Sequence, residues 1–222
     1  MKTNLKTIEY AVDILKSARQ LADYAIELGV SQEEREHRPV YDHMGAILAD
    51  SILQAGLNYA SVVKPRVESI LNSHSEKRTS YTLIEMIDNQ QTADFLNWSH
   101  TTKINRFESI VRFMYSNDVN TSTDLREKLE LDSFGIELLE LDGVGPKTVD
   151  YMKCLVGIDS VAVDRHIRTF AQEAGIVQKD YEFLHKSFCS AADLLSISRR
   201  SFDSWVWSTL ATSKNPQQSF IF

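Results

Sequence analysis

Apolar residues recur every three or four positions along most of this chain, which is the spacing that places them on one face of an α-helix. No segment shows the strict alternation of a half-buried strand. The pattern predicts an all-α fold of about ten helices joined by short loops. The ranges that carry the pattern are 8–28, 44–57, 62–71, 80–88, 92–96, 103–115, 123–129, 136–141, 147–156, 164–175, 181–195 and 202–210.

The length and composition agree with such a fold. A chain of 222 residues has room for one large domain or two small lobes, and its 8 glycines and 4 prolines are few, which favours helices. No apolar run approaches the roughly 18 residues of a membrane span, and residues 1–6 lack the apolar core of a secretory signal. We therefore expect no membrane association and a cytoplasmic location, at the nucleoid if the source is bacterial.

The formal net charge of −7 argues against a protein coated with basic residues for nonspecific nucleic-acid binding. Any DNA binding should therefore use backbone amides and a few well-placed cations, and it should weaken as the salt concentration rises. The two cysteines, Cys154 and Cys189, fit no metal-ligand spacing. We expect each to behave as a small buried apolar residue, and we expect no metal site.

Residues 141–148 read Leu-Asp-Gly-Val-Gly-Pro-Lys-Thr and lie between two apolar helical segments. Gly143 and Gly145 can adopt backbone angles closed to other residues, and they let a phosphate approach the main chain without a Cβ in the way. Their amides and the helix that starts near Pro146 together predict an anion site. A tight connection between two helices is the alternative. Flanking apolar residues favour a helix-hairpin-helix unit over 136–156; they are Leu139, Leu141, Val149 and Met152.

Lys147 stands in the first turn of the outgoing helix, where its charge has the wrong sign for the helix dipole. Either the side chain extends into water, or the site uses a lysine whose lowered pKa makes its amine a nucleophile. Asp164 precedes Arg-His-Ile-Arg and suits the N-cap of the helix that begins there. The apolar run at 161–163 also suits a carboxylate held firmly for catalysis. Both alternatives are open for each residue.

Together, residues 141–149 and 163–166 resemble the helix-hairpin-helix DNA glycosylase superfamily, which includes endonuclease III and 8-oxoguanine glycosylase. The family pattern is Leu-Pro-Gly-(Val or Ile)-Gly-x-Lys followed, one variable helix later, by Val-Asp-x-His. Both halves occur here at the family's usual separation, with Asp142 in place of the frequent proline. The four-cysteine iron–sulfur motif of endonuclease III is absent, so the chain is more similar to the cluster-free branches of the family.

The resemblance implies a two-lobed helical fold with a central cleft between the lobes. Residues 44–170 would form a six-helix barrel lobe that carries the hairpin. Residues 1–43 and 171–222 would form a second lobe from both termini. It also implies a base-excision-repair enzyme, a DNA N-glycosylase with apurinic/apyrimidinic (AP) lyase activity. Lys147 would attack the sugar and form a Schiff base. Asp164 would stabilise the positive charge that develops there or assist deprotonation of the amine.

The resemblance also implies a set of DNA-binding residues. The hairpin would hold the DNA backbone through Gly143, Val144, Gly145 and Thr148. Gln54 and Asn58 lie where relatives fill the hole left by the flipped base, although a polar helix end is the alternative for Gln54. His100 lies in a region that relatives use as a wedge, or it belongs to a capped loop. Arg165 would approach the DNA backbone, or it is a solvated helix residue.

The expected partner is double-stranded DNA that contains a damaged or modified base, and the expected state is a monomer. We expect no resident cofactor and no iron–sulfur cluster, while a monovalent cation at the hairpin is compatible with the pattern. One alternative is a noncatalytic helix-hairpin-helix protein that clamps DNA. Another is a glycosylase directed at enzymatically modified bases. The combination of Lys147 and Asp164 separates an enzyme from a clamp, because a clamp needs neither residue at these positions.

Overall fold

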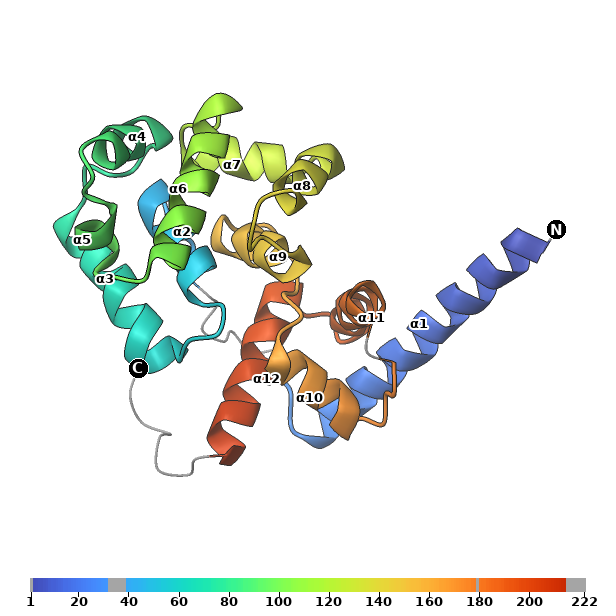
Figure 1. Cartoon of the computed structure of the whole chain (residues 1–222). Helices are drawn as coiled ribbons and strands as arrows, with labels where there is room; N and C mark the ends of the chain where they lie inside the picture. Colours follow the sequence, from blue (N-terminus) through green and yellow to red (C-terminus); the bar gives the residue numbers. More distant parts are fainter. Residues whose placement is uncertain (1, 32–38, 179, 215–222) are drawn as a thin grey trace. The chain divides into compact units, whose positions relative to one another are not determined.

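The fold consists of α-helices, as the apolar spacing predicts. The computed structural model describes residues 2–31, 39–178 and 180–214, which form twelve α-helices and a short π-helical turn; no strand occurs among these residues (Figure 1). The chain divides into two compact units: a central unit, Pro39–Ile158, and a terminal unit, which combines Met1–Arg38 with Asp159–Phe222. The all-α class is confirmed. The interlobe cleft and the helix-hairpin-helix assignment stay predictions.

The central unit is built around α2 (Met44–Leu53), whose ten residues are all buried. Its sequence is apolar on every side apart from Asp50 and Ser51, which is typical of a helix in the middle of a domain. The other elements of this unit are η1 (Tyr59–Val63), α3 (Lys64–Ser73), α4 (Ser80–Asp88), α5 (Thr92–Leu96), α6 (Thr101–Ser116), α7 (Ser122–Leu129), α8 (Asp132–Leu139) and α9 (Pro146–Leu155). Among them α2 packs against α3, α4, α6 and α9 (Figure 1).

The terminal unit contains α1 (Lys2–Glu27), α10 (Arg165–Glu173), α11 (Tyr181–Leu194) and α12 (Arg199–Lys214). Helix α1 packs along α11, and α10 packs against α12. The core of this unit is rich in aromatic residues, and Phe170 of α10 is completely buried in it. Its ring contacts the rings of Tyr24, Phe188, Phe202 and Trp205.

The boundaries of the units differ from the predicted lobes. The central unit begins at Pro39 and ends at Ile158, whereas the resemblance implied a lobe over 44–170. The difference at the second boundary concerns α10. Its apolar face, which includes Ile167 and Phe170, lies in the core of the terminal unit, so this helix folds with the chain termini. Residues 159–170, which the prediction placed in the barrel lobe, therefore belong to the terminal unit.

Most helices lie where the apolar spacing predicts them, and α4 and α5 have the predicted limits. Helix α2 is shorter than predicted, because Gln54 ends it as the C-cap and Gly56 follows with a φ of +78°. Helix α7 begins with a capping box formed by Thr121 and Asp124. Among the described residues, no helix combines the length and apolar character that crossing a bilayer requires.

The capping box of α7 predicts an acid-sensitive contribution to stability. Asp124 Oδ2 accepts hydrogen bonds from the amides of Thr121 at 2.8 Å and Asn120 at 3.1 Å. Burial alone would raise the pKa of the Asp124 carboxyl, but the hydrogen bonds from Thr121 and Asn120 outweigh it and lower this pKa. The carboxylate therefore stabilises the folded state above its unfolded pKa of about 3.9, and this contribution is lost as the pH falls through the lower, folded value.

We expect Asp124→Asn to lower the free energy of unfolding at pH 7 by about 1 kcal/mol. Urea denaturation at pH 7 and at about pH 3 measures the effect, and the difference from the wild type should shrink at the lower pH. The matched control is Asp132→Asn, which changes an exposed aspartate in the first turn of α8. Equal losses in both variants at pH 7 would contradict a specific role for the capping box.

Candidate functional site

The turn between α8 and α9 is fixed by Gly143 and by a contact with α6. Gly143 has a φ of +76°, a conformation that L-residues rarely adopt, and a Cβ at this position would overlap the side chain of Arg106. Arg106 Nε lies 3.1 Å from Asp142 Oδ2. Asp142 occupies the position where the glycosylase pattern has proline, so in this chain an ion pair to α6 holds the start of the turn.

Gly145 differs from Gly143, and the expectation that both glycines provide unusual backbone angles is wrong for it. Its φ of −117° and ψ of 175° are extended values that any residue adopts. A Cβ at Gly145 would meet no atom within 4 Å. The backbone at this residue is therefore open to an approaching ligand, and the absence of a side chain keeps it so.

The amides of the turn divide into two groups. Val144 N donates to Leu141 O at 3.0 Å and Thr148 N donates to Gly145 O at 2.8 Å, so both amides are used within the turn. The side chains of Val144 and Thr148 are also buried. In the described parts of the chain, the amides of Gly143 and Gly145 have no acceptor. An anion at this turn would be bound by the two glycine amides rather than by Val144 and Thr148.

Lys147 is the second residue of α9, and its half-buried side chain points to α2. Its Nζ lies 2.5 Å from Oε1 of Gln54, the C-cap residue of α2. Gln54 Nε2 lies 3.4 Å from the carbonyl oxygen of Ser51, which orients the amide with its oxygen toward the lysine. The structure thus brings together two of the residues that the sequence singled out, although they are far apart along the chain.

One turn away from this pair, Asp50 joins the same two helices. Its carboxylate is completely buried and accepts a hydrogen bond from Tyr151 Oη of α9 at 3.1 Å. Asp50 and Gln54 are four residues apart on α2, and Lys147 and Tyr151 are four apart on α9, so each pair shares one helix face. The two contacts therefore set an antiparallel register between α2 and α9. Sequence reasoning missed Asp50, although a lone carboxylate in an apolar helix is a recognisable signal.

Two further tyrosines complete the environment of the Asp50 carboxylate. Tyr59 Oη lies 3.2 Å from Asp50 Oδ2 and Tyr41 Oη lies 3.4 Å from the same oxygen. Burial, together with the adjacent carboxylate of Asp50, raises the pKa of Tyr59 to about 12 and raises the pKa of Tyr41 as well. These phenols stay protonated at neutral pH, so they serve as hydrogen-bond donors to the buried carboxylate.

Asp164 is the N-cap of α10 in the terminal unit. Its Oδ1 accepts hydrogen bonds from the amides of His166 at 2.8 Å and Ile167 at 3.0 Å, which confirms the capping interpretation. Val163, just before it, is buried and anchors the chain that carries the carboxylate. The other oxygen, Oδ2, has no hydrogen bond or ion pair in the described residues. Capping therefore accounts for Oδ1 of this carboxylate, and Oδ2 is not part of the cap.

The remaining predicted residues lie at the surface. Asn58 caps η1 through a bond from Ser61 N to its Oδ1 at 3.0 Å, so its side chain has a structural role. His100 is the exposed N-cap residue of α6, and its side chain makes no capping bond. Arg165 is exposed on α10, with its Nε 3.3 Å from Nε2 of His166. Contacts of these three residues with DNA stay predictions.

Sequence reasoning also missed Lys103, which binds carbonyl oxygens at the carboxyl end of α2. Lys103 Nζ donates to the carbonyl oxygens of Ile52 at 2.5 Å and Ala55 at 2.7 Å. Burial, followed by the neighbouring positive charges of Arg106 and Lys147, lowers the pKa of Lys103 to about 8. Three cations therefore gather beside the turn: Lys103, Arg106 and Lys147.

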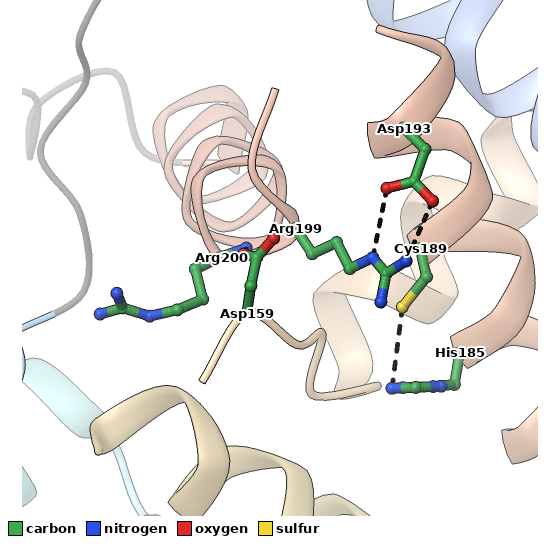
Figure 2. A network of polar contacts seen from close by, with 6 residues as sticks. All are labelled: Asp159, His185, Cys189, Asp193, Arg199 and Arg200. Carbon is green, nitrogen blue, oxygen red and sulfur yellow. Dashed lines mark hydrogen bonds and ion pairs between the residues drawn. The ribbon is translucent and has the colours of Figure 1, made fainter. Parts of the chain in front are cut away.

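A second polar cluster lies in the terminal unit (Figure 2). Cys189 Sγ lies 3.8 Å from His185 Nε2 on the same face of α11, and Arg199 of α12 pairs with Asp193 of α11 at 3.0 Å. Asp159 accepts a bond from the backbone amide of Arg200. The cluster connects α11 and α12 with the loop before α10, which carries Asp159. Both cysteines are buried, as expected, and neither is in a disulfide. In the described ranges, no three His, Cys, Asp or Glu side chains are grouped to hold a metal ion.

No family model, curated protein or solved structure matches this chain.

The two glycines of the turn should respond differently to substitution. Gly143→Ala should lower the free energy of unfolding by about 1–2 kcal/mol, because it forces an L-residue into a positive φ and displaces Arg106. Gly145→Ala should change it by less than about 0.5 kcal/mol. Urea denaturation measures both. In an Arg106→Ala background, only the backbone part of the cost of Gly143→Ala should remain. Equal stability of the two glycine variants would contradict this account of the turn.

Proposed function

We propose that this protein is a DNA glycosylase with AP lyase activity, in which the amine of Lys147 is the nucleophile. The observation that carries the proposal is the placement of that amine. Lys147 lies two residues after Gly145 of the open turn, and its amine donates to Gln54 Oε1. An amine and a candidate phosphate site therefore lie within one helical turn of each other. A nucleic-acid sugar next to a bound phosphate would come within reach of such an amine.

The turn supports binding of the DNA backbone. The amides of Gly143 and Gly145 and the N-terminus of α9 all favour an anion at this place. The cations Lys103 and Arg106 add positive potential beside it in a protein whose net charge is −7. Affinity for duplex DNA should therefore come from a small, local site, and it should fall as the salt concentration rises.

The chemistry of Lys147 follows from the reactivity of a neutral amine. After the damaged nucleotide is rotated out of the duplex, the lone pair of Nζ forms a bond to the sugar C1′. The C1′–N glycosidic bond breaks, and its electron pair leaves with the base, which takes up a proton. The amine gives up one proton, and the C1′–O4′ bond opens with its electron pair going to O4′, which takes up a proton from the solvent; the nitrogen lone pair then forms the C=N bond of a protonated Schiff base. Loss of a C2′ proton then expels the 3′ phosphate and cuts the strand, and hydrolysis returns the lysine.

Asp164 supplies the carboxylate of the proposed reaction. Its Oδ1 is held by two backbone amides of α10, which fixes the direction of the group, and its Oδ2 stays available. Such a fixed negative charge stabilises the positive charge that develops on the sugar as the base departs, or it accepts the proton that the amine gives up. The partner is duplex DNA that contains a damaged or enzymatically modified base, and the protein acts as a monomer without a cofactor.

A noncatalytic DNA clamp is the second candidate, and one observation favours it. The N-cap bonds of Asp164 by themselves explain why an aspartate stands at this position. The clamp and the enzyme differ in what they require of Lys147, because only the enzyme uses its amine to form a covalent bond. Duplexes carrying oxidised, deaminated, alkylated, enzymatically modified or abasic sites, incubated with the protein and then with borohydride, separate the two.

We expect Lys147→Gln to bind duplex DNA with nearly the affinity of the wild type and to lose the borohydride-trapped complex and strand cleavage. The glutamine keeps a polar side chain next to Gln54 but has no amine for Schiff-base formation. Denaturing gels of trapped complexes on an abasic duplex measure the loss, which should be at least about hundredfold.

The matched control is Lys153→Gln, because Lys153 is a lysine of the same helix that pairs with Asp150 at 3.6 Å. This control should be trapped like the wild type. Trapping of Lys147→Gln at the wild-type yield would show that another amine is the nucleophile. A wild-type protein that binds these duplexes and is never trapped would support the clamp.

Asp164→Asn should slow base removal by about a hundredfold or more, while the protein stays folded. Asparagine is an N-cap as good as aspartate, so the start of α10 is preserved and only the negative charge is lost. Single-turnover kinetics measure the rate of base release. The control is Asp180→Asn at the N-cap of α11, where the carboxylate accepts a bond from Phe183 N at 2.9 Å. A rate for Asp164→Asn within a few-fold of the control would limit Asp164 to a structural role.

A further inference from the structure

Two lysines from different helices converge on the carboxyl end of α2. Lys103 of α6 donates to the carbonyl oxygens of Ile52 and Ala55, and Lys147 of α9 donates to the side chain of Gln54. Three residues of the segment 52–55, namely Ile52, Gln54 and Ala55, therefore accept the bonds of both ammonium groups. This arrangement follows from the packing of α2 against both α6 and α9 (Figure 1).

The bonds of Lys103 fix the position of Gln54. They hold the backbone carbonyls on either side of this residue, at Ile52 and Ala55, with lengths of 2.5 and 2.7 Å. The Gln54 amide is turned by its contact with Ser51 O, so Oε1 faces Lys147 Nζ. A rigid helix end thus carries the acceptor that directs the amine, and the rigidity depends on Lys103.

The two lysines also influence each other by charge. The pKa of Lys103 is lowered to about 8, first by burial and then by the charges of Arg106 and Lys147. This electrostatic coupling is mutual, because two interacting groups titrate as a pair. A cation close to a lysine is one of the established ways to favour the neutral, nucleophilic amine.

The other charged groups nearby are engaged with partners of their own. Asp142 of the turn pairs with Arg106 at 3.1 Å, and Asp150 of α9 pairs with Lys153 at 3.6 Å. The buried carboxylate of Asp50 on α2 accepts bonds from three phenols, those of Tyr41, Tyr59 and Tyr151. The charges of Asp142 and Asp150 are thus compensated by cations, whereas the neutral phenols solvate Asp50 without removing its charge; the positive charges of Lys103 and Arg106 act on Lys147 against that one carboxylate.

We propose that Lys103 is a positioning residue for Lys147: its ammonium fixes the Gln54 acceptor that directs the amine and, as the neighbouring positive charge, favours the neutral form of that amine. The inference rests on the proposed function, because it assigns Lys147 as the attacking group. Lys103 itself forms no bond to the DNA in this scheme. Its ammonium group donates hydrogen bonds to the two carbonyl oxygens, and these bonds hold the positive charge beside the Lys147 amine.

Three substitutions separate charge from position. Lys103→Arg keeps the positive charge, Lys103→Gln keeps a hydrogen-bond donor for the carbonyls without the charge, and Lys103→Met removes both. Lys64→Gln, at an exposed lysine of α3, is the matched control. Where Lys103→Met does not fold, as judged by urea denaturation, Lys103→Gln decides the test, because it retains the bond that holds the helix end.

The first readout is the reactivity of Lys147 in the free protein, without DNA. Acetylation of Lys147 by acetic anhydride is followed by mass spectrometry as a function of pH. Lys103→Gln should move the midpoint of this profile up by about one pH unit, which means about tenfold less neutral amine near neutral pH. Lys103→Arg and Lys64→Gln should keep the wild-type midpoint. An unchanged midpoint in Lys103→Gln and Lys103→Met would overturn the inference.

The second readout is the rate of borohydride trapping on an abasic duplex. At pH 7 and saturating duplex the rate for Lys103→Gln should be about tenfold lower than for the wild type, and the rate should recover as the pH rises. A residue that only supports the fold would lower the rate equally at every pH, and that result would also overturn the inference.

The two readouts distinguish failure of the inference from failure of the proposed function. If the wild type traps no duplex, the proposed function fails, and the acetylation profile still decides whether Lys103 controls the Lys147 amine. If the wild type is trapped through Lys147 and the pH profile of Lys103→Gln is unchanged, the function stands and the inference fails. Trapping through Lys103 would overturn both assignments.

Discussion

The candidate site depends on one constraint, the buried carboxylate of Asp50 in the middle of an apolar helix. A carboxylate that is shielded from solvent must be hydrogen-bonded, because leaving a buried charge without a partner costs about 3–5 kcal/mol. Three phenols meet this requirement, and the one from Tyr151 belongs to α9. That bond aligns α9 with α2, and one turn along the same faces the alignment brings Lys147 to Gln54. The position of the amine is thus a consequence of how the core satisfies a charge.

The surroundings of the turn explain how an acidic protein can offer a site for an anion. Positive charge is concentrated on α6 and α9 beside the turn, where Arg106 pairs with Asp142 and Lys103 lies against backbone carbonyls. The open backbone of Gly145 adds amide dipoles without adding net charge. A site of this kind favours selective binding over general attraction to nucleic acid, in agreement with the charge of −7.

The sequence predicted the elements well and the site in part. Helical spacing located the helices because local periodicity reports which face is buried, and the N-cap role of Asp164 follows from its neighbours in sequence. The resemblance named Lys147 and Gln54 as separate site residues, and it did not predict the contact between them. The carbonyl partners of Lys103 could not be predicted either, because backbone oxygens of a distant helix leave no signature in the sequence. Gly145 was misjudged for a related reason: its glycine reflects open space around the residue rather than its own torsion angles.

In the proposed reaction one particular amine, held at the end of α2, forms a covalent bond with the DNA sugar. The most direct measurement is peptide mapping, by mass spectrometry, of the protein cross-linked by borohydride to an abasic duplex. We expect a single modified peptide that carries the sugar adduct on Lys147. An adduct on any other lysine, or a protein that binds the duplex tightly without forming an adduct, would contradict it.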